Sequence, residues 1–315
     1  MVIFHKDDLK KTVLAISVLI TGATGLVGSR LTELLLAKGH TVSHLGRSKK
    51  SGNVPSFVWD VRKGEIDPTA FQGAQAIVHL AGASVGEKRW TPKRKREILE
   101  SRTKSSALIY ETLKKNPGEV TTVVSASAIG FYGNTLGNEV YSEEHRPGTD
   151  FLAGVVDAWE KEVERITSLA KRVVKLRIGI VLSEHEGALQ QMAKPVRMFV
   201  GSPLASGNQI VSWIQVDDLC EMFIKAIEDQ TMRGTYNAVA PRPVSNREMT
   251  KVIARILKRP LLLPSVPGFV LHVVLGEFAD AVIKGSTISS EKIQKTGFKF
   301  KFPELEGALK DCLKG

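Results

Sequence analysis

The stretch VLITGATGLVGSRLTELLLAKGHTVSHLGRS (Val18–Ser48) decides the fold. Its apolar start predicts a strand over residues 15–20, and its amphipathic middle predicts a helix over residues 29–38. Between them, three glycines stand at a GxxGxxG spacing: Gly22, Gly25 and Gly28. Such glycines allow a tight turn, a close approach of the backbone to a pyrophosphate, and close packing of the helix on the strand.

The helix that follows this loop would direct free amide groups and the positive end of its dipole at an anion. We therefore predict a dinucleotide-binding loop. The other residues predicted to line it are Thr24, Leu26 and Val27. The alternative is a strand, turn and helix whose glycines serve packing alone.

Arg47 follows the second predicted strand (residues 41–45) and lies 19 residues after Gly28. In NAD-binding folds, an acidic residue about 20 residues past the last glycine binds the ribose 2′-hydroxyl. Here Arg47 and Ser48 stand instead, and a guanidinium suits a 2′-phosphate. The sequence therefore predicts NADP(H) as the cofactor; the alternative is an arginine in an exposed turn. Asp60 ends the third predicted strand and is placed to meet an adenine edge or to form a turn.

Composition limits the remaining possibilities. The 315 residues are 43% hydrophobic and contain two cysteines, Cys220 and Cys312, which excludes a disulfide framework and suits a cytoplasmic protein. The net charge of +11 is spread along the chain without interleaved aromatic residues, so we expect no nucleic-acid partner. The longest apolar stretches, 12–20 and 269–275, are too short to span a membrane. The seven histidines show no metal spacing, and His79 reads as a core residue.

Short apolar runs alternate with helical periods through the first part of the chain, which predicts βαβ units and a doubly wound parallel sheet of the Rossmann type. The further strands are expected at 56–60, 76–81, 120–125 and 173–180, and the further helices at 92–115 and 153–170. The rhythm changes after residue 182. We therefore predict a Rossmann domain over 15–180 and a smaller α+β substrate domain over 181–315, with a return to the first domain at about 209–239.

Several motifs together resemble the extended short-chain dehydrogenase/reductase family, which includes the NAD-dependent epimerase/dehydratases. The shared motifs are TGATGLVG (21–28), HLAGA (79–83) and VVSASAIGFYG (123–133). An atypical branch, usually named "epimerase family protein" and sometimes labelled cell-division-inhibitor-like, is indicated by further motifs: RWT (89–91), SR (101–102), RIGIVL (177–182), SWIQVDD (212–218) and GFKFKFPELEGAL (297–309).

The resemblance implies a cofactor between two domains and assigns residues to it. Leu80, Ala81 and Gly82 would line the cofactor at the end of the fourth strand. Arg102 would reach its phosphates from the long helix, with Glu97 near the same place; the alternative for both is a charged pair on a solvated helix face. From the RIGIVL motif, Val181 would border the nicotinamide end, and Arg177 is counted with the cofactor residues.

The catalytic residues of the wider family are Ser, Tyr and Lys, with the last two in a YxxxK segment. Ser127, or alternatively Ser125, occupies the serine position. The segment DFLAGVVDAWEKEVE (150–164) stands where YxxxK is expected and offers Phe151/Val155 or Leu152/Val156, neither of which can carry a proton. Tyr132 is the nearest substitute acid; the alternative for it is a packed aromatic residue.

The leading functional hypothesis is an NADP(H)-binding oxidoreductase or epimerase-like enzyme. It would act by hydride transfer on a small carbonyl compound or a nucleotide-sugar. The rival hypothesis is an NADPH-binding sensor or scaffold without turnover, which the missing Tyr/Lys pair favours. We expect a small-molecule substrate, no metal, no membrane partner and a possible homodimer.

Overall fold

The computed structural model describes residues 15–116, 118–133 and 139–313. At its centre lies an eight-stranded sheet in the order β12-β8-β6-β5-β1-β2-β3-β4. Neighbouring strands are parallel, except that β4 runs antiparallel to β3. The strands are β1 (Ser17–Thr21), β2 (Thr41–Gly46), β3 (Ser56–Asp60), β4 (Glu65–Ile66), β5 (Ala76–His79), β6 (Thr122–Ala128), β8 (Arg172–Ile178) and β12 (Gly234–Ala238).

This strand order confirms the predicted doubly wound Rossmann sheet. The chain leaves β1 toward β2 on one side, whereas β5 and β6 lie on the other side of β1. The loops that follow β1 and β5 therefore meet at the point where the strand order reverses. Ligands of open α/β sheets bind at such a point, at the carboxyl ends of the strands.

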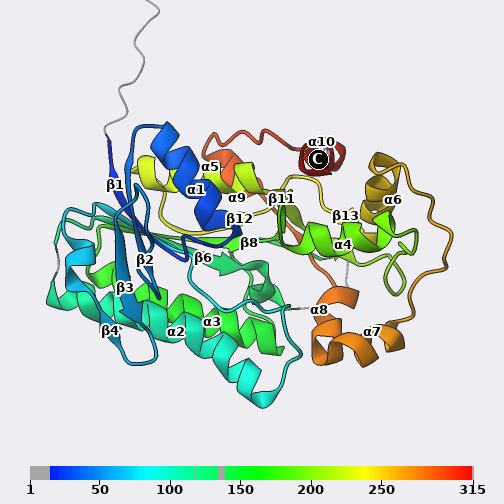
Figure 1. The fold of residues 1–315 in the computed structure, drawn as a ribbon, viewed down its shortest axis with the longest axis horizontal. Coiled ribbons are helices and arrows are strands. Elements are labelled where there is room, and N and C mark those ends of the chain that lie inside the picture. Colours follow the sequence, from blue (N-terminus) through cyan, green and yellow to red (C-terminus); the bar gives the residue numbers. More distant parts are fainter. Residues whose placement is uncertain (1–14, 117, 134–138, 314–315) are drawn as a thin grey trace, which may run out of the picture.

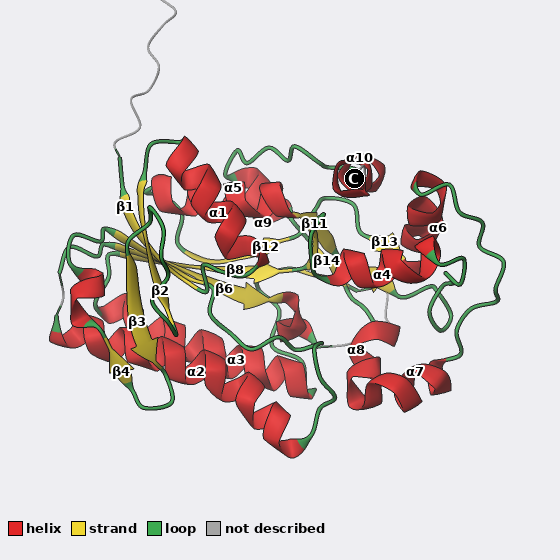
Figure 2. Ribbon diagram, viewed as in Figure 1, coloured by secondary structure: helices red, strands yellow, loops and turns green. Residues whose placement is uncertain are grey.

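Helices cover both faces of the sheet (Figures 1 and 2). The helices α2 (Pro92–Lys115) and α3 (Phe151–Glu164) contact each other on one face, and α1 (Leu26–Ala37) and α5 (Val216–Glu228) contact each other on the opposite face. The main apolar core fills the space between these helices and the strands. Strands that are covered on both sides in this way read as continuous apolar runs, which is why the sequence revealed them.

A second apolar cluster lies away from the sheet and includes Trp213, Leu189 and Met249. Its helices are α4 (Ala188–Arg197), α6 (Asn246–Ile256) and α10 (Leu305–Leu313), with α7 (Gly268–Leu275) and α8 (Ala279–Ile283) beside them in Figure 1. The remaining elements are β7 (Val140–Tyr141), β9 (Ile180–Leu182), β10 (Ile210–Val211), β11 (Trp213–Gln215), β13 (Val244–Ser245), β14 (Thr287–Ile288), α9 (Glu291–Lys295), η1 (Pro68–Phe71), η2 (Ile129–Tyr132), η3 (Arg165–Ser168) and η4 (Gly276–Phe278).

Several predicted boundaries are wrong. The helix expected at 29–38 begins at Leu26, inside the glycine loop, and ends at Ala37. The strand expected to end at residue 125 continues to Ala128, because β8 offers it a partner as far as Ile178. Strand 173–180 divides at Gly179, where a Cβ atom would lie 2.5 Å from a backbone oxygen of the neighbouring β11 segment. The helix expected at 153–170 begins at Phe151, because Asp150 caps it by accepting a hydrogen bond of 2.9 Å from an amide of its first turn, and it ends at Glu164.

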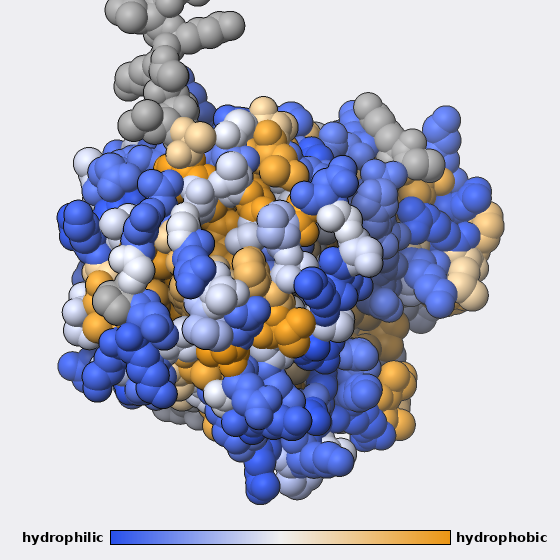
Figure 3. All heavy atoms as spheres, turned by 60° about the vertical axis from the view of Figure 1, so that its left-hand side comes forward, coloured by the Kyte–Doolittle hydropathy of each residue, from blue (hydrophilic) through white to orange (hydrophobic). Residues whose placement is uncertain are grey.

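Polar and apolar side chains are interspersed on the face that Figure 3 presents. None of the helices in the described ranges combines the length and apolar character that a membrane crossing requires. Within the same ranges, no three or more His, Cys, Asp or Glu side chains are grouped in a way that could hold a metal ion.

Candidate functional site

The glycine loop joins β1 to α1 and divides its three glycines between two roles. Gly22 has φ +69°, and a Cβ atom on it would lie 2.9 Å from the backbone nitrogen of Ala81. A Cβ atom on Gly28 would lie 2.4 Å from the backbone oxygen of Gly22. Both glycines are therefore required by packing. Gly25 differs, because a Cβ atom there would meet only the Gly22 oxygen at 3.5 Å, an ordinary contact.

Gly25 is also the N-cap of α1, and no side chain accepts a hydrogen bond from the amides of the first turn. An uncapped helix start leaves several backbone donors without a protein partner. Thr24 and Gly25 are exposed, and Leu26 and Val27 are half-buried. The loop therefore presents free donors and the positive end of a helix dipole beside a residue that lacks a side chain.

A buried histidine fixes the backbone opposite this loop. The Thr21 hydroxyl accepts hydrogen bonds from the amides of Leu80 (3.1 Å) and Ala81 (3.2 Å), and it lies 2.7 Å from Nδ1 of His79. Nε2 of the same ring lies 3.1 Å from the Ser105 hydroxyl. Burial lowers the pKa of His79 to about 3, and the nearby Arg102 charge lowers it further, so the ring is neutral. His79 is thus the satisfied core residue that the sequence predicted.

Arg47 and Ser48 are exposed directly after β2. Among the described residues, no carboxylate pairs with Arg47. At the end of β3, one carboxylate oxygen of Asp60 accepts hydrogen bonds from the amides of Arg62 (2.9 Å) and Lys63 (3.2 Å). Asp60 is therefore a turn residue, which was one of the two roles expected for it, and the adenine contact stays a prediction.

Arg102 lies beside Gly82, after β5. A Cβ atom on Gly82 would come within 3.2 Å of the Arg102 guanidinium carbon. This guanidinium donates to the backbone oxygen of Ile98 at 3.0 Å and lies 5.3 Å from the Trp159 ring. Burial lowers the pKa of Arg102 to about 10, with a further contribution from the charge of Arg94. No carboxylate in the described part of the chain pairs with Arg102, so this cation lacks a counter-charge.

Glu97 occupies the same stretch of α2 and is paired with Arg94 at 2.7 Å. This hydrogen bond lowers the pKa of Glu97, and the charges of Arg62 and Lys88 act in the same direction. The carboxylate is therefore ionised, and its side chain is 44% exposed. The alternative of a simple Glu97–Arg102 pair on a solvated face is wrong, because the partner of Glu97 is Arg94.

The predicted catalytic residues lie in a buried network. Ser127 lies inside β6 and is 3% exposed, and its hydroxyl donates to Oε1 of Glu160 at 2.5 Å. Glu160 also forms a two-pronged ion pair with Arg177, at 2.8 and 2.9 Å. Ser125 is fully buried, and its hydroxyl donates to the backbone oxygen of the next residue. Arg177 therefore lies in this network, and its contact with the cofactor stays a prediction.

Tyr132 closes the other end of the same network. Its ring is 2% exposed, and its hydroxyl donates to Oδ1 of Asn237 at 2.6 Å and accepts from Arg177 at 3.0 Å. Burial raises the pKa of Tyr132, although the Arg177 charge opposes this effect. Burial is the largest single influence on Arg177 and opposes its charge, but the contacts with Glu160 and Tyr132 together raise the pKa of Arg177. The hydroxyl of Tyr132 and the charge of Arg177 thus both have partners within the protein.

The start of α3, where the wider family carries its YxxxK segment, is apolar. Phe151 packs edge-on against Trp90 with ring centroids 5.0 Å apart, and Trp90 also contacts Phe278 at 5.5 Å. Val155 and Val156 are buried. No side chain at these positions can exchange a proton.

Val181 lies in β9, which pairs with β11 just beyond the end of β8, and it is half-buried. A Cβ atom on Gly187 would lie 3.0 Å from Cδ1 of Leu26, so the segment after β9 approaches the start of α1. The structure therefore brings three segments to one edge of the sheet: the glycine loop, the β9 segment, and the loop after β5 with Leu80, Ala81 and Gly82.

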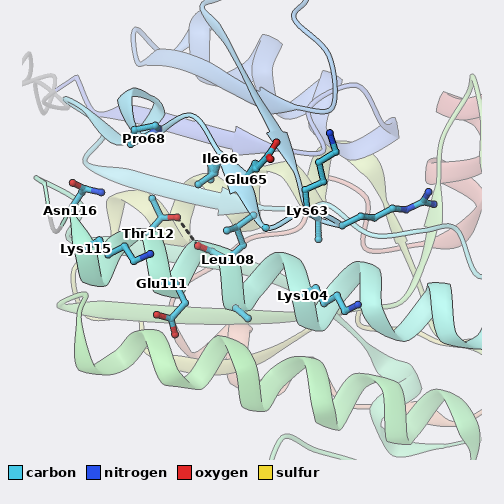
Figure 4. A pocket seen from close by; sticks show the side chains of 14 residues that line it. Lys63, Glu65, Ile66, Pro68, Lys104, Leu108, Glu111, Thr112, Lys115 and Asn116 are labelled. Carbon is cyan, nitrogen blue, oxygen red and sulfur yellow. Dashed lines mark hydrogen bonds between the residues drawn. The ribbon is translucent and has the colours of Figure 1, made fainter.

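A groove of about 740 Å³ lies elsewhere, between the β3–β4 turn and the second half of α2 (Figure 4). Lys63 lines it from the turn, Glu65 and Ile66 line it from β4, and Lys104 and Leu108 line it from the helix. None of the site residues predicted from the sequence, all of which the structure describes, lines this groove. It is separate from the glycine loop.

Comparisons with known proteins agree with this geometry. Residues 18–239 match the model of the NAD-dependent epimerase/dehydratase family, and residues 266–312 match a domain of unknown function. The chain is similar to the chloroplastic epimerase family protein SDR39U1 homolog of Arabidopsis thaliana, with 36% identity over 93% of this chain and 86% of the relative.

Two solved structures are similar over nearly the whole chain. Human epimerase family protein SDR39U1, solved with NADPH, has a TM-score of 0.86 and 29% identity, covering 95% of this chain and 100% of the human one. A nucleoside-diphosphate sugar epimerase of Corynebacterium glutamicum has a TM-score of 0.77 and 31% identity, covering 94% of this chain and 57% of its own. The chain therefore belongs to the NAD-dependent epimerase/dehydratase family.

Proposed function

We propose that this protein binds NADP(H) and uses it for hydride transfer on a small carbonyl compound or nucleotide-sugar. The observation that carries the proposal is the uncapped start of α1 beside Gly25, where backbone donors have no side-chain partner. A diphosphate is the group that such a helix start is built to receive. The human relative solved with NADPH supports the same assignment.

The preference for NADP(H) over NAD(H) rests on Arg47. Its guanidinium is exposed after β2 and has no carboxylate partner among the described residues. Arg47 and Ser48 would hold the 2′-phosphate, since a guanidinium binds phosphate through two parallel hydrogen bonds. An acidic residue at this position would instead select the ribose 2′-hydroxyl of NAD(H).

Other residues fit the rest of a dinucleotide. Arg102 would neutralise a phosphate, and the ionised Glu97 would accept hydrogen bonds from ribose hydroxyls. Leu80, Ala81 and Gly82 would allow close approach, and Val181 would border the nicotinamide. The bound cofactor supplies the hydride at its nicotinamide C4, and the protein supplies orientation and electrostatics.

Hydride transfer to or from a carbonyl compound also requires the transfer of a proton. Ser127 and Tyr132 are the candidates for this step, because they lie nearest the family's catalytic positions. The Tyr132 hydroxyl would have to leave Asn237 or Arg177 to reach a substrate, since both hydrogen-bond it. This observation favours a second candidate function. In that case the protein is an NADPH-binding sensor or scaffold, and the network of Tyr132 and Glu160 is purely structural.

Stopped-flow measurement of NADPH oxidation across a panel of carbonyl compounds and nucleotide-sugars tests the proposal. Oxidation of bound NADPH by one compound class supports the enzyme and names its substrate class. Tight NADPH binding without oxidation by any compound supports the sensor. Absence of NADPH binding contradicts both functions.

A further inference from the structure

Arg94 stands in the first turn of α2 and connects two parts of the candidate site. Its side chain is 7% exposed. Nη1 donates to the Glu97 carboxylate at 2.7 Å, and Nη2 donates to the backbone oxygen of Ser84 in the segment after β5. A second carboxylate, Glu87 of the same segment, lies 3.5 Å away. Arg94 therefore links the segment after β5, through Ser84 and Glu87, to the exposed carboxylate of Glu97 on α2.

These contacts give the fold little reason to keep an arginine here. These ion pairs are weak evidence for stability, because burial desolvates the Arg94 guanidinium while solvent screens the exposed carboxylates of Glu97 and Glu87. Nε of Arg94 is also buried without a hydrogen-bond partner among the described residues. Arg102 lies close enough for its charge and that of Arg94 to oppose each other. Arg94 and Arg102 thus lie close together. Among the described residues, Glu97 and Glu87 both pair with Arg94, whereas Arg102 has no carboxylate partner.

The pairing gives Glu97 a property that a free carboxylate would lack. A bare negative charge beside a pyrophosphate would repel it, but the Arg94 guanidinium behind the carboxylate offsets that charge. Glu97 remains ionised and 44% exposed, so its oxygens keep acceptor capacity on the solvent side. The chemical groups that match such an acceptor next to phosphates are the hydroxyls of a ribose.

We propose that Arg94 is a positioning residue for the dinucleotide. It holds Glu97 as a hydrogen-bond acceptor for ribose hydroxyls, and it fixes Ser84 in the segment that follows Gly82, the glycine beside Arg102. The inference rests on the proposed NADP(H) function. It adds a residue that does not itself touch the cofactor and acts through Glu97.

A double-mutant cycle separates this role from a merely structural one. The variants are Arg94→Met, Glu97→Gln and the two combined, together with Arg94→Lys as the conservative replacement. The matched control is Arg96→Met, since Arg96 lies in the same turn of α2, is exposed, and has no ion pair in the described ranges. The readouts are the NADPH dissociation constant, measured by fluorescence titration of the full chain, and the thermal unfolding midpoint.

We expect Arg94→Met and Glu97→Gln each to weaken NADPH binding about tenfold, because each removes a charge-assisted contact. The combined variant should be no weaker than Glu97→Gln alone, Arg94→Lys should recover most of the loss, and Arg96→Met should bind as the wild type does. Additive losses, or an unchanged affinity in Glu97→Gln, overturn the inference while leaving the proposed function intact. Failure of the wild type itself to bind NADPH contradicts the proposed function and, with it, this inference.

Discussion

Two regions at the carboxyl edge of the sheet differ in how many of their polar and charged groups have partners within the protein. At the glycine loop, the start of α1 has no side-chain cap, and Arg47 and Arg102 have no carboxylate partner in the part of the chain that the structure describes. At the end of β6, by contrast, the polar atoms of Ser127 and Tyr132 are bonded to neighbouring protein groups. The two regions are parts of the same edge, yet only the first lacks partners.

The contrast separates binding from catalysis. A buried cation without a counter-charge, as at Arg102, lowers the stability of the protein alone, so a region that keeps one beside a free helix start is adapted to an anionic ligand. A region whose buried groups are paired is rigid and adapted to the fold. The structure is therefore stronger evidence for a bound dinucleotide than for a proton donor, and the following substitutions test each side of that comparison.

The largest effect is expected from Gly28→Val. Its side chain would lie 2.4 Å from the backbone oxygen of Gly22 and 2.6 Å from Cα of Ala23, and backbone cannot move aside cheaply. We expect loss of NADPH binding together with a marked fall in the thermal unfolding midpoint. Gly25→Ala is the matched variant, because its methyl group has room but occupies the face where the phosphates would lie. It should weaken NADPH binding at least about tenfold with an unchanged midpoint; equal affinity to the wild type contradicts the loop assignment.

The next largest effect is expected in the second region, the buried network around Glu160 and Arg177. Glu160→Gln leaves the buried Arg177 without its counter-charge, and such a change lowers the free energy of unfolding by about 3–5 kcal/mol. Chemical denaturation measures it. Glu162→Gln on the same helix removes only a surface pair with Arg165, and it should change the stability by less than about 1 kcal/mol. Similar small losses in both variants would show that the network does not stabilise the fold.

Arg47→Asp tests the selectivity of the first region. We expect it to weaken NADPH binding about 10- to 100-fold, since it removes a charge-assisted contact and adds a repulsion, whereas NADH binding should change by less than about threefold. Lys114→Asp, an equal change of charge near the end of α2, should affect neither. Parallel titrations with the two cofactors give the answer. Equal losses for NADPH and NADH would contradict the assignment of the 2′-phosphate.

Tyr132→Phe should have the smallest effect. It removes a hydroxyl that bonds Asn237 and Arg177, which should lower the free energy of unfolding by about 1–2 kcal/mol and leave the NADPH affinity unchanged. Once a turned-over substrate is known, kcat distinguishes the two roles of this hydroxyl. A kcat that falls by more than about a hundredfold with unchanged NADPH affinity assigns Tyr132 to proton transfer.

The sequence predicted well those parts of the fold that depend on local signals. The helix expected at 92–115 has these same bounds. Thr91 caps its start, Pro92 is its first residue, and two lysines in its last turn favour the negative end of its dipole. The doubly wound parallel sheet followed from the alternation of apolar runs and helices. The glycine loop was also readable, since a strand, a GxxGxxG spacing and a helix occur in series.

Long-range pairing was not predicted. Glu160 reads as an exposed helix residue, and its role depends on Arg177, which β8 brings beside α3. A signal was nevertheless present: Lys175 and Arg177 alternate with apolar residues in a buried strand, so one face of that strand must find acidic partners. The pairing of Glu97 with Arg94 rather than with Arg102 was readable from the spacing, because helix residues three apart face each other and residues five apart do not.

The central claim is that the glycine loop and Arg47 together bind a 2′-phosphorylated dinucleotide. Equilibrium titration of the purified full chain with NADPH and with NADH, followed by cofactor fluorescence, tests it most directly. We predict saturable binding of both, with a dissociation constant for NADPH at least about tenfold below that for NADH. No saturable binding of NADPH, or equal constants for the two cofactors, would contradict the claim.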